Sequence, residues 1–175
     1  MRRVYAVVFV LLMIASIGAS AEPRKIDKSN YGFYLGESKQ SLIQRAKHEG
    51  IAYSQKGKLS DQLFPDSYLF NSSLDKSKQV EHALVSFYKD HVGQVSIYLD
   101  VNSEKQFMQA AQVLEQSWSS FSGYSDQTFG PSYIITLPEV LITLVRAKPQ
   151  TYIAYIHRGL MRTMNEERSK TVVKK

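Results

Sequence analysis

Residues 80–118 constrain the fold more than any other stretch, because their pattern predicts a strand, a turn, a second strand and a helix in succession. Apolar and polar residues alternate on both sides of the turn, which is typical of strands that are buried on one face. The turn, Asp90-His91-Val92-Gly93, has the residue types of a type I turn closed by a glycine bulge. This turn predicts a register in which Phe87 opposes Ile97. The alternation assigns one set of aliphatic and aromatic side chains to the inner face of the hairpin: Ala83, Val85, Phe87, Val95, Ile97, Leu99 and Val101.

Two helices are predicted from their capping residues. Ser103 and Gln106 have the spacing of a capping box, in which each side chain bonds the other residue's backbone N–H. Upstream, Ser38 is the expected N-cap of a helix over residues 39–49, with Gly50 as its stop signal. Both helices carry an apolar stripe that predicts one buried side. In the second helix the stripe consists of Phe107, Ala111, Leu114 and Trp118.

The remaining strands are predicted from β-branched runs bounded by proline. The runs at 133–137, 140–146 and 151–157 indicate a three-stranded antiparallel meander. The Ser-, Gly- and Tyr-rich residues 119–130 are expected to connect the second helix to it. Residues 31–35 are a candidate short strand. Residues 53–78 are expected to hold one strand near 67–70 between long loops, where a binding loop is one option.

Together these elements predict a single α+β domain over residues 31–158, with two helices packed on one apolar face of one or two antiparallel meander sheets. The repeated order of a helix and three strands suggests a tandem α-β-β-β duplication with repeats 31–101 and 102–158. A chance succession of common elements is the alternative. Residues 159–175 are expected to form a short helix and a basic tail.

The N-terminus has the pattern of an export signal. Two arginines precede an apolar run over residues 4–15, and Ala19-Ser20-Ala21 has the small residues of a cleavage site. The expected result is a Sec-type signal peptide, residues 1–21, cleaved after Ala21 and followed by a polar leader, residues 22–30. This predicts a periplasmic or secreted protein. The alternative is an uncleaved membrane anchor.

Charge and cysteine content narrow the partner classes. The chain has no cysteine, which excludes disulfides and a lipid-attachment cysteine after the signal. Its net charge is +6, and +4 remains once the two signal arginines are removed. Residues 162–175 hold five basic and two acidic residues, a net charge of +3. We predict that this basic tail makes weak contact with an anionic surface. The alternative is that it is a solvated end. No nucleic-acid partner is expected.

No catalytic or metal-binding motif stands out. The four histidines, at positions 48, 82, 91 and 157, have no metal-ligand spacing, and no serine lies in a nucleophile motif. His82, Asp100 and His157 are the best metal trio that the pattern allows, against the alternative of histidines without that role. We therefore predict no metal and no cofactor. An enzyme remains an alternative because catalytic residues can be assembled from distant positions.

Aromatic residues offer the better candidate for binding, with 11 tyrosines and eight phenylalanines in the chain. Tyr88 and Tyr98 fall on the outward face of the predicted hairpin, and Tyr155 shares one face of the last strand with His157. Tyrosine gives amphipathic contact area at low entropic cost, which recognition surfaces use. These four residues are the candidate binding residues. The alternative is that the cross-strand tyrosines only stabilise a solvated face.

Two short motifs, Leu35-Gly36-Glu37-Ser38 before a helix that ends at Gly50 and the hairpin Phe87 to Val95, carry a family resemblance. Across residues 31–157 the chain resembles the small exported α/β modules typified by the outer-membrane assembly lipoprotein BamE (SmpA/OmlA type) and by the β-lactamase inhibitor protein. The resemblance implies a non-enzymatic module that binds proteins through a sheet face or loops. The inhibitor protein is itself a tandem duplication. The missing lipobox cysteine departs from the BamE pattern and argues against an outer-membrane anchor.

The expected function is therefore a non-enzymatic protein-binding or adaptor module of the bacterial cell envelope. Its partner would be an envelope or extracellular protein. Two alternatives remain, a periplasmic small-ligand carrier and an enzyme with no recognisable motif. A carrier would need a concave apolar pocket, which the helices could line if they stand away from the sheet.

Overall fold

The computed structural model describes residues 31–59, 63–76, 80–101, 103–117, 121–127, 130–147 and 150–172. These residues form three helices, α2 (Lys39–His48), α3 (Glu104–Ser117) and α4 (Arg158–Val172). The strands are β1 (Tyr53–Gln55), β2 (Asp66–Phe70), β3 (Ala83–Tyr88), β4 (His91–Leu99), β5 (Phe121–Gln127), β6 (Gly130–Thr136), β7 (Val140–Ala147) and β8 (Gln150–His157). Within the described ranges, no helix is both long and apolar enough to span a membrane.

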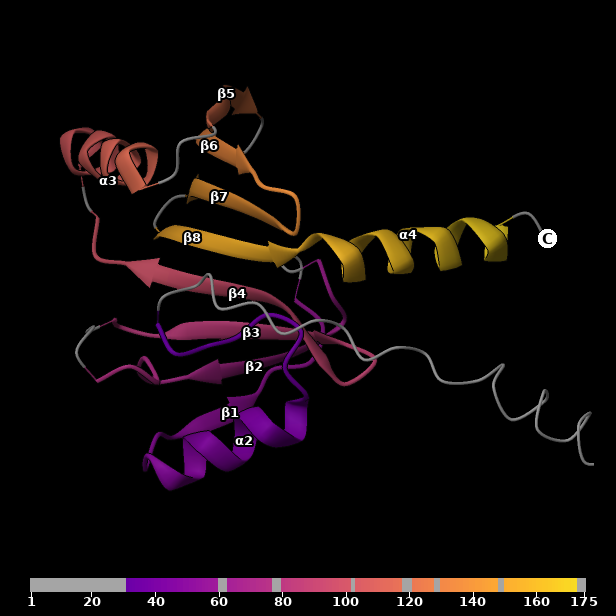
Figure 1. The fold of residues 1–175 in the computed structure, drawn as a ribbon. Coiled ribbons are helices and arrows are strands. Elements are labelled where there is room, and N and C mark those ends of the chain that lie inside the picture. The colour runs from indigo at the N-terminus through magenta and orange to yellow at the C-terminus, as the bar shows by residue number, and fades with distance from the viewer. Residues whose placement is uncertain are drawn as a thin grey trace, which may run out of the picture.

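All eight strands belong to one sheet with the order β1-β2-β3-β4-β8-β7-β6-β5, in which neighbouring strands are antiparallel (Figure 1). Each half of the chain supplies a helix and then a meander of four consecutive strands. The two meanders join in the middle, where β4 pairs with β8. The order is thus a mirror image about that central pair. The predicted α+β class is confirmed, with one sheet rather than two.

Three segments differ from the prediction. β5, within the predicted connection 119–130, and the three-residue strand β1 are additional strands at the two edges of the sheet. Edge strands pair on one side only, so a run with Gly and Asp is tolerated there and carries a weak sequence signal. Residues 31–35 form no strand, although Phe33 and Leu35 are fully buried. Phe33 and Leu35 are apolar because they pack against the core.

The predicted register of the β3–β4 hairpin is wrong. The turn consists of Lys89 and Asp90, both at left-handed φ values of 48° and 60°, so Tyr88 pairs with His91. Such a two-residue turn matches the twist of the strands. A bulge between Ser86 and Phe87 then shifts the register, so that Ala83 rather than Phe87 opposes Ile97. The shift is by four residues for Ala83 to Ser86 and by five for Phe87 and Tyr88 on the other side of the bulge. The extra residue at the bulge therefore leaves the predicted inner face unchanged.

The predicted helix caps are confirmed. The Ser41 backbone N–H donates to Ser38 Oγ at 3.2 Å, and Gly50 after α2 has a φ of 69°. At α3 the capping box is reciprocal. The Gln106 N–H donates to Ser103 Oγ at 3.2 Å, and the Ser103 N–H donates to Gln106 Oε1 at 3.1 Å. These bonds satisfy donors that the first turn of a helix otherwise leaves unpaired.

The main core joins the two capped helices to one face of the sheet. Leu42 and Ala46 of α2 are buried in the same cluster as Phe107, Ala111 and Leu114 of α3. Trp118, the last residue of the predicted stripe, lies outside the described residues. The sheet contributes alternate residues to this cluster, among them Val85, Val95, Ile97, Ile142, Leu144, Ile153 and Tyr155. We call this side of the sheet the helix-covered face, and the residues between them in the strands form the outer face.

A second, smaller cluster lies on the outer face. It consists of Phe64, Leu160 and Met164, with Tyr88 and Ile156 packed against it. Leu160 and Met164 belong to the predicted terminal helix, α4, which begins directly after β8 and extends away from the sheet (Figure 1). The first turns of α4 are thus held to the body through a cluster that is separate from the main core.

Candidate functional site

The four predicted binding residues lie on opposite faces of the sheet. Tyr88 and Tyr98 belong to the outer face, whereas Tyr155 is part of the main core and only 4% exposed. This burial raises the pKa of the Tyr155 hydroxyl well above its usual range. His157 is also buried, and its Nδ1 accepts a hydrogen bond from the Leu160 backbone N–H at 3.4 Å. The structure therefore does not gather the four into one surface.

Tyr98 is the centre of a row of rings on the outer face. The His82 ring stacks on it with centroids 4.3 Å apart, and the Tyr152 ring follows on the other side at 5.5 Å. Tyr98 itself is 8% exposed, while Tyr152 is half-buried. Cross-strand aromatic contacts of this kind stabilise the central strands. Tyr152, which the sequence prediction did not single out, is therefore the ring of this pair that reaches solvent more.

Tyr152 shares the outer face of the second meander with other half-buried apolar side chains. Register places Tyr152 opposite Val145, and Ile156 opposite Leu141, on adjacent strands β8 and β7. We define the outer apolar patch as Ile134, Leu141, Val145, Tyr152 and Ile156, all of intermediate exposure. An antiparallel sheet covered by helices on one face usually turns polar side chains to solvent on the other. The patch departs from that rule.

Part of the outer face of the first meander is different, because it carries polar side chains that are already covered. Ser67 Oγ and Ser86 Oγ lie 2.9 Å apart, and Gln94 Oε1 accepts a hydrogen bond from the Leu63 backbone N–H at 3.1 Å. Next to Leu63, the fully buried Phe64 packs so close to Gly93 that a Cβ there would be 2.5 Å from its ring. Any side chain at position 93 would clash with the Phe64 ring, so this position requires glycine. This part of the predicted loop 53–78 is fixed against the sheet.

Tyr88 contacts α4 and helps to hold it to the sheet. Its hydroxyl donates to Glu167 Oε2 at 2.5 Å, and the Lys89 ammonium forms an ion pair with Glu167 Oε1. Burial and, after it, the hydrogen bond to Glu167 raise the pKa of Tyr88 to about 12. Hydrogen bonds from Lys89 and then Tyr88 lower the pKa of the Glu167 carboxyl. The Tyr88 ring therefore contributes to an internal contact of the chain.

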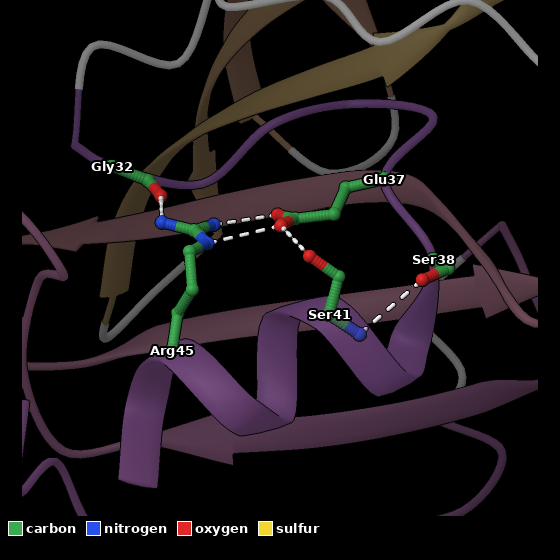
Figure 2. Close-up of polar contacts among 5 residues, drawn as sticks. All are labelled: Gly32, Glu37, Ser38, Ser41 and Arg45. Atoms are coloured by element: carbon green, nitrogen blue, oxygen red, sulfur yellow. Dashed lines mark hydrogen bonds and ion pairs between the residues drawn. The ribbon is translucent and has the colours of Figure 1, made fainter. Parts of the chain in front are cut away.

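An ion pair between the half-buried Arg45 and the buried Glu37 ties α2 to the segment that precedes it (Figure 2). Arg45 donates from Nε and Nη2 to the two oxygens of Glu37 at 2.9 and 2.5 Å, and from Nη1 to the Gly32 carbonyl at 2.8 Å. The Ser41 hydroxyl donates to Glu37 Oε1 at 2.7 Å. The Glu37 side chain is only 2% exposed. With three donors on one buried carboxylate, the arrangement is that of a structural clamp rather than of a base open to a substrate.

The described residues hold no metal cluster, and two of the cavities that they line lie along helices. No group of three His, Asp or Glu among them could bind a metal ion. His82 stacks on Tyr98 at the outer face, whereas His157 shares the helix-covered face with Tyr155, so the predicted trio is not assembled. The described walls of a cavity of about 540 Å³ come from α4 alone, and those of one of about 410 Å³ come from α2 and Leu74. A single helix does not enclose a small molecule.

The outer apolar patch is accordingly the best candidate site within the described residues. Its side chains offer contact area and one phenolic hydroxyl, but no nucleophile, acid–base pair or metal ligand. No protein-family model matches the chain, and no curated protein or solved structure is detectably similar to it. The chemistry and placement of the patch are therefore the basis for a functional proposal.

Proposed function

We propose that the protein is a non-enzymatic protein-binding or adaptor module of the bacterial cell envelope, with the outer apolar patch as its recognition surface. The observation that carries this proposal is that five half-buried apolar side chains lie on three adjacent strands, on the sheet face opposite the main core. Apolar patches of this kind at the surface mark interaction sites. Tyr152 is the natural anchor, since aromatic side chains with fixed neighbours contribute most to protein interfaces.

We further propose that the two halves descend from a tandem duplication. Ser38 and Ser103 cap the first helix of each half, and four strands follow each helix. The mirror order of the strands supports the same idea. Such a duplication would join two similar sheets edge to edge into one wide face. A width of this kind suits a protein partner, because stable interfaces bury about 800 Å² on each side.

A flat sheet face favours a protein over a small ligand. A carrier needs a concave site that surrounds most of its ligand. The patch lies on three adjacent strands, β6, β7 and β8, and the described cavities lie along helices instead. The resemblance to exported modules that bind proteins through a sheet face supports the same choice.

Export is part of this proposal and has a direct test. We expect signal cleavage after Ala21, so that the protein recovered from the bacterial envelope or medium begins at Glu22. Mass spectrometry of the intact purified protein measures this N-terminus. A protein that begins at Met1 and remains in the membrane fraction would contradict both the cleavage and the proposed location.

The recognition surface is tested by comparing two double variants in a crosslinking pull-down from the native envelope. Leu141→Ser with Tyr152→Ser removes the centre of the patch, and it should cost at least ~2 kcal/mol at the interface, about a 30-fold loss of affinity. The matched control is Met108→Ser with Val113→Ser, which removes apolar side chains of α3 that are 48% and 62% exposed. Thermal unfolding of each variant verifies that it is folded. Equal capture by the two variants would mean that the patch is not the recognition surface.

A further inference from the structure

α4 and the residues that follow it in the sequence hold most of the net positive charge of the mature chain. Residues 162–175 account for a net charge of +3, against +4 for the whole chain without its signal arginines. The helix starts at the end of β8 with no intervening loop and extends beyond the sheet (Figure 1). The rest of the mature chain is therefore nearly neutral. We call α4 the basic arm, and its own residues, 158–172, include four basic and two acidic side chains, a net charge of +2.

One side of this arm is used to hold it to the body. Leu160 and Met164 are buried against Phe64, and Glu167 receives Tyr88 and Lys89. Positions 160, 164 and 167 follow the spacing of one helix face. The carboxylate of Glu167 is thus turned to the body and is compensated there by Lys89.

The other sides of the arm present basic residues to solvent. Arg162, Arg168 and Lys170 are exposed, and Glu166 is the exposed acidic residue among the described part of α4. Arg158 differs from them, because its guanidinium donates to the Leu137 carbonyl at 2.6 Å. In the sequence, Lys174 and Lys175 continue the same charge. The exposed part of α4 is therefore cationic.

We propose that α4 binds the surface of an anionic phospholipid bilayer from outside, as a peripheral contact. A helix that stands clear of the sheet can lie along a flat surface without steric conflict with the domain. The number of charges also fits this partner. Each basic residue near an anionic leaflet adds an increment of binding, so the three exposed basic residues of α4 give a weak, reversible contact. Specific nucleic-acid binding commonly neutralises about six to ten phosphates, more than this arm supplies.

This contact is independent of the proposed recognition surface. The outer apolar patch is made by β6, β7 and β8, whereas the exposed basic residues Arg162, Arg168 and Lys170 belong to α4. A protein held at a bilayer by α4 would still present the patch. The two proposals can therefore fail separately.

The test measures co-sedimentation of the mature chain, beginning at Glu22, with vesicles of equal parts phosphatidylglycerol and phosphatidylcholine, and with vesicles of phosphatidylcholine alone. We expect binding to the anionic vesicles only, and weaker binding at high salt. The triple variant Arg162→Gln, Arg168→Gln and Lys170→Gln should lower the partition coefficient on the order of 100-fold, because each basic residue contributes about five-fold.

A matched control separates α4 from net charge. Lys47→Gln, Lys56→Gln and Lys105→Gln remove the same charge from exposed positions outside α4, and this variant should bind the anionic vesicles within a few-fold of wild type. Equal losses in the two triple variants would overturn the assignment to α4. So would equal binding of the wild type to both kinds of vesicle. Tighter binding to a short DNA duplex than to anionic vesicles would replace the bilayer by a nucleic acid.

Discussion

Replacing Arg45 by methionine is expected to lower the free energy of unfolding by about 3 to 5 kcal/mol. The substitution leaves the Glu37 carboxylate without its two-point partner, although that side chain is only 2% exposed. A buried charge that loses its partner keeps the full cost of its desolvation. The Gly32 carbonyl also loses a donor. Urea denaturation of the variant and the wild type gives this difference.

Two further variants identify the cause. Glu37→Leu combined with Arg45→Met removes both charges and should recover most of the lost stability, since apolar replacement of a buried pair is often near neutral. Lys76→Met breaks an exposed ion pair with Glu49, whose side chains are 70% and 36% exposed, and should cost less than about 1 kcal/mol. A loss for Arg45→Met as small as that for Lys76→Met would show that the clamp is not a stabilising element.

Phe107→Ala should destabilise the protein by a similar amount, about 3 to 5 kcal/mol. Phe107 is fully buried in the main core, and its ring centroid lies 5.8 Å from that of Tyr133 on β6. Truncation removes apolar contacts and leaves a cavity that the surrounding helix and sheet can fill only in part. The chemical-denaturation midpoint should fall with an unchanged slope.

The next residue along α3 provides the control for this prediction. Met108 is 48% exposed, so Met108→Ala should change the free energy of unfolding by less than about 1 kcal/mol. If Phe107→Ala also cost less than about 1 kcal/mol, its ring would not be part of the core. The pair therefore tests whether the apolar stripe of α3 faces the sheet.

Local sequence signals predicted the elements better than their pairing. The caps at Ser38 and Ser103 depend on contacts three residues apart, and the structure has both. The hairpin register depends on which residues form the turn. Lys89 and Asp90 adopt left-handed φ values that favour Asn or Gly, so their role as the turn is not visible in the sequence. β5 was missed because its residues resemble a loop and its partner β6 supplies the pairing.

The candidate site was harder to predict because both faces of β8 are apolar. Ile153 and Tyr155 alternate with Tyr152, Ala154 and Ile156, and the sequence does not tell which set meets the helices. The structure buries Tyr155 in the main core and leaves Tyr152 half-buried on the outer face. Alternation predicts which residues share a face of the strand. Which of the two faces is buried depends on where α2 and α3 pack, and these helices come from other parts of the chain.

The last strand of the chain, β8, completes the middle of the sheet. β4 lies inside the finished sheet, yet one of its two neighbours is the last strand of the chain. While the chain emerges from the ribosome or a membrane channel, seven strands exist before β8, and the edge of β4 has no partner from its own chain. An unpaired edge is a template for pairing with other molecules. Any fragment that ends before Gln150 keeps that edge, so loss of residues 150–175, about a seventh of the sequence, would leave β4 as an unpaired edge strand that can pair with other molecules.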